Sequence, residues 1–374
     1  MLPAPAFVIE REKVLSNLTV LRAVKEAAQI ELLFALKGFA LPALMPDILS
    51  VADGIAASSL NEALLGYQYS RKPVHLYAPA YRPADVPMLI PITGTWVFNS
   101  LEAYHRWHPY LPESIEIGLR VNPHYGHASA DIYNPGRPGS RLGVPPTATQ
   151  YPLPPRISGL HVHTLCEADA EAFATLIEAL LHQFAPWLAQ VRWLNLGGGH
   201  LITRNGYNVS LFVDTIKQLR HRLPHIQRIS IEPSAAFVWE AGVLISEILD
   251  ITQTEGRRWA MLDVSFTAHM PDTLEMPYRP IVREALPEVN PAYPTYWLGG
   301  VTCLAGDEMG PYSFSKPLEV GQRITFHDMA HYTFVKTTTF NGVAHPAIVI
   351  TENGGFRIVK TFDFEDYKRR LSCG

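Results

Sequence analysis

A lysine directly follows a short apolar run near the start of the chain. Residues 32–36 read Leu-Leu-Phe-Ala-Leu, and Lys37 and a glycine come next. An unbroken apolar run of this length is typical of a buried strand, which would place the lysine at the strand's end. Desolvation there would lower the pKa of Lys37 and make its neutral amine available as a Schiff-base nucleophile. The alternative is a lysine that only ends a strand in solvent.

Three consecutive glycines, Gly197, Gly198 and Gly199, follow another apolar run, residues 191–196. Glycines let the backbone approach an anion closely and present free amides to it, so such a loop is typical of a phosphate site. No Gly-Lys-Ser/Thr follows, and the loop does not open a dinucleotide-binding unit, which excludes both common nucleotide motifs. A tight turn without a ligand is the alternative.

Two histidines, His161 and His163, are separated by one residue and would therefore share one side of a strand. This spacing occurs in metal sites, but the sequence shows no companion carboxylate or third histidine, so no metal site is expected. One histidine could lie flat against a planar cofactor. The alternative is a core histidine that is satisfied by hydrogen bonds.

Further polar groups stand at the ends of later runs. Glu232 follows residues 229–231, and the proline after it would terminate the strand. Cys303 and Asp307 share a turn, and Tyr332 precedes a Phe-Asn-Gly sequence at residues 340–342. Each of these groups could also be ordinary turn or core chemistry.

The elements that must position these groups alternate between strands and helices. An amphipathic helix is predicted at residues 11–29, with Val14, Leu18, Leu21 and Val24 on one face. Short apolar runs are then separated by helix-length segments, at residues 32–36, 54–57, 74–77, 96–98, 115–121, 157–163, 191–196 and 229–231. Eight buried parallel strands with helices between them predict a (β/α)₈ barrel, in which chemistry sits where the strands end.

The pattern changes after Gly242. Apolar runs at residues 243–252, 258–264, 296–302, 323–327 and 347–351 are linked by turns rather than by long helices. This pattern predicts an antiparallel β-domain. We therefore expect a barrel over residues 12–242 and a β-domain over residues 243–374 that includes an N-terminal strand within residues 1–11.

Composition excludes several classes of protein. The 374 residues carry 31 Lys and Arg against 35 Asp and Glu, so no basic excess exists to neutralise a nucleic acid. No apolar run approaches the roughly 20 residues that span a bilayer, so no membrane partner is expected. The cysteines, Cys166, Cys303 and Cys373, are odd in number and far apart, which fits neither a disulfide framework nor a zinc knuckle. A soluble protein of the reducing cytoplasm is expected.

The order of these motifs matches one family. A strand-end lysine, His-x-His, Gly-Gly-Gly, Glu-Pro, Cys-x-x-Gly-Asp and a late tyrosine follow one another along the chain. In this combination the sequence resembles the pyridoxal-phosphate-dependent basic amino acid decarboxylases of the alanine-racemase-like fold. The resemblance extends from residue 7 to residue 340.

The resemblance implies pyridoxal 5'-phosphate as cofactor and assigns roles to individual residues. Lys37 would form the Schiff base, His163 would stack on the ring, and Glu232 would pair with the pyridine nitrogen. The residues expected beside the ring or the phosphate are Arg120, Tyr332, Gly197, Gly198 and Gly199. Cys303 would return a proton to the α-carbon, and it would arrive with Asp307 from the partner subunit of a homodimer.

Two positions depart from the family pattern. Ser234 and Ala235 stand where the wider group has Gly-Arg after Glu-Pro, so an arginine near the phosphate is missing. Leu304 stands where an acid usually follows the cysteine. Contacts to the phosphate and to the substrate are therefore expected to differ from those of the wider group.

Within this family the chain is most similar to the branch that acts on carboxylated polyamines, carboxynorspermidine or carboxyspermidine. The likeness rests on the sequences of residues 161–167 and 302–307. A substrate with a distal ammonium needs a carboxylate, and the candidates are Asp272, Glu275 and Asp307. Decarboxylation of diaminopimelate or ornithine stays an alternative, as does a non-catalytic regulator that binds the cofactor. Retention of Lys37 and Cys303 argues against the regulator.

Overall fold

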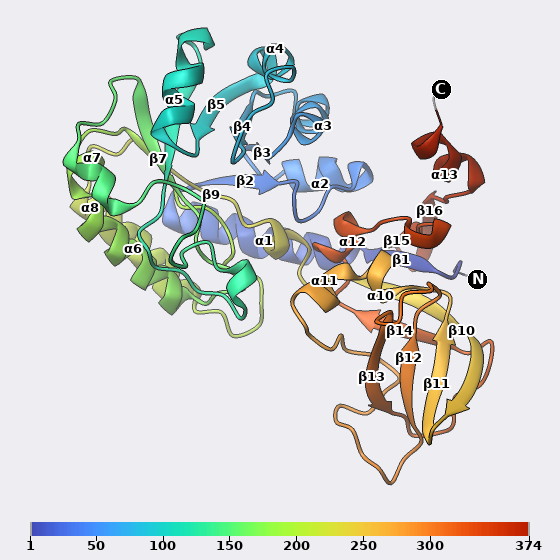
Figure 1. Cartoon of the computed structure of the whole chain (residues 1–374). Coiled ribbons are helices and arrows are strands. Elements are labelled where there is room, and N and C mark those ends of the chain that lie inside the picture. The colour runs from blue at the N-terminus through green and yellow to red at the C-terminus, as the bar shows by residue number, and fades with distance from the viewer. Residues whose placement is uncertain (1, 373–374) are drawn as a thin grey trace. The chain divides into compact units, whose positions relative to one another are not determined.

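The computed structural model describes residues 2–372, and the chain divides into two compact units. One unit is Leu15–Phe237, and the other joins Met1–Val14 to Val238–Gly374. We call them the barrel unit and the sheet unit. In Figure 1 the barrel unit runs from blue to yellow-green, and most of the sheet unit runs from yellow to red.

The barrel unit contains a closed barrel of eight parallel strands (Figure 1). In order these are β2 (Glu31–Ala35), β3 (Gly54–Ala57), β4 (Val74–Tyr77), β5 (Thr93–Phe98), β6 (Glu116–Val121), β7 (Ile157–Val162), β8 (Trp193–Asn195) and β9 (Arg228–Ile231). Closure is made by β9 against β2, where Leu32 pairs with Ile231. The predicted (β/α)₈ barrel is confirmed.

Helices follow most of the strands. They are α1 (Arg11–Ala28), α2 (Met45–Leu49), α3 (Leu60–Ser70), α4 (Val86–Leu89), α5 (Leu101–Trp107), α6 (Ala170–Gln183), α7 (Ala185–Leu188), α8 (Val209–Arg222) and α9 (Ser234–Val238). Short 3₁₀ turns lie at Pro42–Leu44, Ile90–Ile92, His108–Tyr110, Asp131–Tyr133, Pro146–Gln150 and Phe340–Gly342. The predicted apolar face of α1 is buried at Val14, Leu18, Leu21 and Val24.

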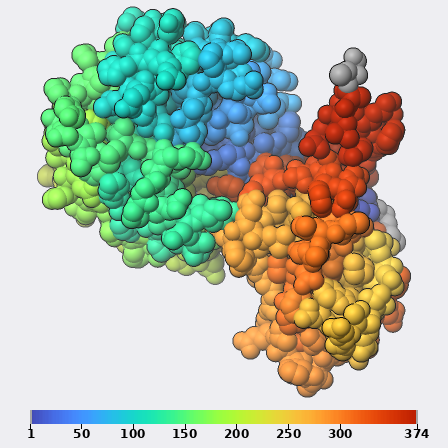
Figure 2. All heavy atoms as spheres, in the orientation of Figure 1, coloured from blue at the N-terminus to red at the C-terminus, as the bar shows by residue number. Residues whose placement is uncertain are grey.

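The sheet unit is built on a sheet of eight strands in the order β13-β12-β11-β10-β1-β15-β16, with β14 paired to β10. The strands are β1 (Ala6–Glu10), β10 (Gly242–Thr254), β11 (Arg257–Leu262), β12 (Thr295–Gly299), β13 (Glu308–Ser313), β14 (Arg323–His327), β15 (Ala347–Glu352) and β16 (Gly355–Lys360). Its helices are α10 (Phe266–His269), α11 (Pro271–Glu275), α12 (Thr333–Lys336) and α13 (Phe364–Leu371). None of the residues of α13, dark red in Figure 2, is buried.

Most neighbouring strands of this sheet pair antiparallel, as expected, but two pairs are parallel, so the sheet is mixed. β11 pairs with β12 in parallel, and β1 pairs with β15 in parallel. A parallel neighbour needs a crossover, and the long segment between β11 and β12, which contains α10 and α11, supplies one. The other parallel pair joins strands from opposite ends of the chain, a relationship that local patterns do not show.

The core of the sheet unit is apolar and well buried, with Phe7, Leu244, Leu298 and Phe326 among its members. Cys166 and Cys303 are free thiols, and Cys373 lies outside the described residues. Within residues 2–372 we find no helix with both the length and the apolar character needed to cross a membrane.

Candidate active site

Functional side chains meet where the barrel strands end. Lys37 follows β2, His163 follows β7 and Glu232 follows β9. All three line one cavity of the barrel unit, together with Ala35, Ala56, Ala57, Ser58, His75, Tyr77 and His161. As the sequence predicted, these three groups lie at the carboxyl ends of barrel strands, where enzymes of this fold have their active sites.

Lys37 and His163 contact each other directly. The Lys37 Nζ lies 3.0 Å from the Nε2 of His163, and the backbone N–H of Gly198 donates to the other ring nitrogen at 2.9 Å. A ring that accepts at Nδ1 carries its proton on Nε2, so His163 donates to Lys37. A lysine that accepts a hydrogen bond is a neutral amine, and burial lowers the pKa of Lys37 in agreement. Burial also lowers the pKa of His163 well below its ordinary value.

Arg120, on β6, contacts the backbone of His163. Its guanidinium donates to the backbone carbonyl of His163 at 2.6 Å and lies over the ring of Tyr77 at 4.6 Å. Arg120 is 3% exposed, and its Nε has no hydrogen-bond partner among the described residues. A buried cation with a spare donor therefore stands next to the cavity.

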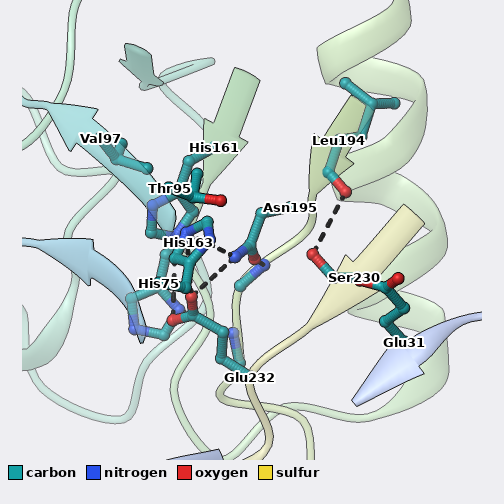
Figure 3. A network of polar contacts seen from close by, with 12 residues as sticks. Glu31, His75, Thr95, Val97, His161, His163, Leu194, Asn195, Ser230 and Glu232 are labelled. Carbon is teal, nitrogen blue, oxygen red and sulfur yellow. Dashed lines mark hydrogen bonds and ion pairs between the residues drawn. The ribbon is translucent and has the colours of Figure 1, made fainter. Parts of the chain in front are cut away.

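Glu232 is held in a polar network that Figure 3 shows at close range. Asn195, the last residue of β8, donates its amide Nδ2 to the Glu232 Oε1 at 2.7 Å and to the His75 Nε2 at 3.0 Å. His161 lies beside this network, with its Nε2 4.0 Å from the Glu232 Oε2. Neither ring nitrogen of His161 has a hydrogen-bond partner among the described residues.

The expectation that His161 lacks companions of metal-ligating type is wrong. The ligand atoms of His75, His161 and Glu232 all lie within 4.8 Å of one another. They come from β4, β7 and the residue after β9, so only closure of the barrel brings them together. In the structure the Asn195 amide lies between two of these groups and donates to both.

The three glycines are required by close packing. An added Cβ on Gly199 would lie 1.9 Å from the backbone oxygen of Leu165, and one on Gly198 would lie 2.1 Å from that of Glu232. Gly199 also has a φ of +91°, in the region that favours glycine. The backbone amides of Gly197 and Gly198 donate to the side chains of Asn195 and His163. Of the three glycine amides, only that of Gly199 takes part in neither of these hydrogen bonds.

The other predicted site residues belong to the sheet unit. Cys303 is exposed, and its backbone N–H donates to the Asn341 side chain at 2.8 Å. Asp307 is 4% exposed and accepts hydrogen bonds from Thr267 and Thr302. It therefore fixes the turn that carries Cys303.

The remaining three are Asp272, Glu275 and Tyr332. Asp272 is buried, with hydroxyl donors on its Oδ2 and no partner for its Oδ1 among the described residues. Glu275 forms an ion pair with Lys336. Tyr332 is 37% exposed and has a φ of +52°.

Sequence reasoning did not identify His75, Tyr77 or Asn195 as site residues. His75 and Tyr77 were polar interruptions of the run at residues 74–77, and Asn195 directly precedes Leu196 and the three glycines. Polar residues inside an apolar strand that ends at a barrel mouth are the signal that could have found them.

Comparison with known proteins decides the family. The model described as pyridoxal-dependent decarboxylase, C-terminal sheet domain, matches residues 13–330. The chain belongs to the pyridoxal-dependent decarboxylase family. It is 46% identical, over 99% of its length and 96% of the relative, to carboxyaminopropylagmatine decarboxylase of Synechocystis sp.. It is 34% identical, over 98% of both chains, to carboxynorspermidine/carboxyspermidine decarboxylase of Campylobacter jejuni.

Solved structures of decarboxylases agree with this family. The crystal structure of carboxynorspermidine decarboxylase complexed with norspermidine from Campylobacter jejuni has a TM-score of 0.90 at 33% identity, and the match covers 99% of this chain and 100% of that one. Diaminopimelate decarboxylase from Helicobacter pylori has a TM-score of 0.81 at 15% identity, which shows the shared fold alone.

The cavity fits the cofactor of this decarboxylase family. It offers a neutral lysine at a barrel mouth and a carboxylate, Glu232, that is 8% exposed. It also offers the two buried ring nitrogens of His161, which have no partners among the described residues, and Arg120 beside it has a buried Nε without a partner among them. Such atoms are costly unless a ligand or water satisfies them, and a polar planar cofactor would do so.

Proposed function

We propose that this decarboxylase removes the carboxylate of a carboxylated polyamine with the help of pyridoxal 5'-phosphate, in polyamine biosynthesis. The proposed substrates are carboxynorspermidine and carboxyspermidine, and the products are norspermidine and spermidine. The observation that carries the proposal is the placement of Lys37, His163 and Glu232 on one cavity, in a chain similar over its full length to polyamine-forming decarboxylases.

The barrel unit would hold the cofactor. Bound pyridoxal phosphate supplies an electron sink for the electron pair left when CO₂ departs. Lys37 would supply the attaching amine, His163 would pack on the ring, and Glu232 would hold a proton at the pyridine nitrogen. The phosphate-side residues would be Gly197, Gly198 and Gly199, with Arg120 beside the ring and Tyr332 near the phosphate.

Cys303 would complete the reaction by giving its thiol proton to the α-carbon, so that a proton replaces the departing CO₂. We propose that Cys303 and Asp307 serve the site of the partner subunit in a homodimer. Exposure of the Cys303 side chain supports this proposal, since a buried thiol could not reach a partner. Val301 and Leu304, close to Cys303 in the chain, are exposed as well, and so is Phe340, which precedes the Asn341 that accepts from the Cys303 backbone.

An acidic group would bind the distal cation of the substrate, and the candidates stay Asp272, Glu275 and Asp307. Asp272 has a buried Oδ1 that lacks a partner among the described residues, which supports its choice. Asp307 is engaged by donors of its own turn. The proposal places the enzyme in the cytoplasm, a compartment that suits the free thiols of Cys166 and Cys303.

A second candidate substrate is carboxyaminopropylagmatine, which ends in a guanidinium group instead of an ammonium. It is favoured by the 46% identity to the relative of that name, against 34% for the carboxynorspermidine/carboxyspermidine relative. The two termini need different pockets, because a planar guanidinium binds a carboxylate through two parallel hydrogen bonds.

Measurement of CO₂ release tests both candidates in one experiment. The purified chain would be assayed on carboxynorspermidine, carboxyspermidine and carboxyaminopropylagmatine, with diaminopimelate and ornithine as controls. We expect kcat/KM to be at least about a hundredfold higher on one of the carboxylated polyamines than on either amino acid, since buried polar groups that lose their partner discriminate strongly. Preference for an amino acid would disprove the proposed function.

A further inference from the structure

The Glu232 carboxylate is buried, and one side-chain amide lies within hydrogen-bond distance of it. The Asn195 Nδ2 is 2.7 Å from the Glu232 Oε1, whereas the nearest atoms of His75 and His161 lie 3.6 Å and 4.0 Å from the carboxylate (Figure 3). A buried carboxylate needs donors to stay charged, so this amide carries the stabilisation that the two histidines do not.

The orientation of the Asn195 amide follows from its other contact. The backbone N–H of Gly197 lies 2.9 Å from the atom assigned as Oδ1. A backbone N–H can only donate, so that atom must be the oxygen. The Nδ2 therefore faces Glu232 and His75, and its two hydrogens go to these two acceptors.

His75 must be neutral in this arrangement. Its Nε2 accepts from the Asn195 amide at 3.0 Å, so the ring carries its proton on Nδ1. Burial lowers the pKa of His75, and it lowers the pKa of His161 well below the ordinary value. Neither ring then offers a positive charge to Glu232.

We propose that Asn195 is a positioning residue, which holds the Glu232 carboxylate by Oε1 and leaves Oε2 for the pyridine nitrogen of the cofactor. His75 is the second acceptor that fixes the amide in place. The inference rests on the proposed function, because it concerns how Glu232 is presented to pyridoxal phosphate. Asn195 acts through Glu232 and needs no contact of its own with the substrate.

Replacement of Asn195 by aspartate tests the donor directly. Asn195→Asp keeps the shape and the acceptor for Gly197, but it donates to Glu232 only when it is protonated. Two carboxyl groups that share a site raise the pKa of one of them. The other ionisable groups that face Glu232 are Lys37, Arg120, His75, His161 and Tyr77.

Because one carboxyl pKa is raised, the affinity of Asn195→Asp for pyridoxal phosphate should depend on pH. At low pH the protonated carboxyl group of the variant donates as the amide does, and affinity for pyridoxal phosphate stays close to that of the wild type. As the pH rises through the shared pKa, the donor is lost and two charges repel. The dissociation constant of the variant, divided by that of the wild type at the same pH, should therefore increase with pH.

A second variant removes the donor at every pH. Asn195→Leu is close in size to asparagine and cannot hydrogen-bond. Loss of a hydrogen bond to a charged group predicts a dissociation constant about tenfold higher across the whole pH range. The matched control is Asn122→Asp, because Asn122 is 2% exposed and its amide donates instead to the carbonyls of Pro135 and Leu142.

The experiment titrates pyridoxal phosphate into the full-length chain stripped of cofactor, at several pH values, and records the thermal midpoint of each stripped protein. The proposal is supported if the dissociation constant of the variant, divided by that of the wild type, rises with pH for Asn195→Asp but not for Asn122→Asp. Wild-type affinity at every pH in both Asn195 variants would overturn it, as would a lower thermal midpoint with unchanged affinity. Failure of the proposed function gives different results: the wild-type chain would prefer an amino acid in the CO₂ assay or would itself bind no pyridoxal phosphate.

Discussion

The Nζ of Lys37 lies 3.0 Å from the Nε2 of His163, and the two groups are ordered as acceptor and donor. The direction of this hydrogen bond is set by a third residue, because the backbone N–H of Gly198 donates to the Nδ1 of the His163 ring and leaves the ring proton on Nε2. Lys37 is therefore held as a neutral amine at the end of a barrel strand. That is the form of lysine that attacks an aldehyde carbon.

Substitution of Lys37 by alanine should abolish covalent attachment of the cofactor. Purified wild-type protein is expected to be yellow, and borohydride should fix the cofactor onto Lys37 because its neutral amine is the available nucleophile. Mass mapping of the reduced peptides measures the site. A reduced adduct on any other lysine of the wild-type chain would remove Lys37 from its proposed role.

Glu232→Gln should retain the cofactor and lose most of the turnover. An amide cannot hold the ring nitrogen protonated as a carboxylate does, so the electron sink weakens. A charge-assisted contact of this kind predicts a loss in kcat of about a hundredfold or more. Steady-state assays with absorption spectra of the bound cofactor measure both effects, and near-normal kcat would take Glu232 out of the mechanism.

Gly199→Ala should weaken binding of pyridoxal phosphate by disrupting the loop. The new Cβ would lie 1.9 Å from the backbone oxygen of Leu165, so the chain must shift. Gly206→Ala is the matched control, because Gly206 also has a positive φ, +80°, but nothing lies within 4 Å of its added Cβ. Titration of the cofactor should show at least about a tenfold loss for the first variant and little change for the second, since only the first combines strain with overpacking. Equal affinities would show that the loop adapts.

Strand-end residues such as Lys37 and Glu232 were predictable from the sequence because short apolar runs mark the barrel strands that precede them. Lys37 follows residues 32–36 and Glu232 follows residues 229–231, so their place at one end of the barrel needs only the count of strands and the fold rule. The family resemblance then supplied roles that no spacing could supply.

Relationships between distant strands could not be predicted in the same way. Asn195 and His75 lie on β8 and β4, and their contact exists only because the barrel closes. The parallel pairing of β1 with β15 likewise joins the two ends of the chain. Side-chain periodicity reports which face of a strand is buried, and it carries no information on which strand lies beside it.

His200 should make folding stability depend on pH. Its ring packs between Phe173 and Phe212 at centroid distances of 5.0 Å and 5.5 Å, and neither ring nitrogen has a hydrogen-bond partner among the described residues. Burial lowers its pKa from 6.5 to about 4 in the folded protein. The unfolded chain therefore binds this proton first as the pH falls, and stability declines between pH 6.5 and about 4.

Replacement by leucine isolates that contribution from those of the other buried histidines. The free energy of unfolding falls in both proteins between neutral pH and a pH below the folded pKa of His200. The fall should be about 3 kcal/mol smaller for His200→Leu than for the wild type. Urea denaturation at the two pH values measures the difference. Identical pH dependence in the two proteins would show that His200 is solvated or partnered in solution.

Cys303 would act across the interface of the proposed homodimer. If Cys303 delivers the α-proton from the neighbouring chain, Cys303→Ala should still release CO₂ but should misplace the proton. Some turnovers would then end with the proton on the cofactor carbon, which yields an aldehyde from the substrate. Product analysis by chromatography measures the fraction diverted, and a wild-type product ratio would contradict this role of the thiol.

Mixing two impaired variants tests whether the site is shared. Lys37→Ala and Cys303→Ala would damage different halves of each site, so a mixed dimer holds one site in which both residues are intact and one in which both are lost. Random exchange makes about half of the dimers mixed, and one site in two is restored, so activity should recover to roughly a quarter of the wild-type value. A site built from one chain predicts no recovery at all. Exchange of subunits must therefore be shown separately, with two differently tagged copies. If exchange is proven and activity does not recover, Lys37 of one subunit and Cys303 of the other do not form one active site.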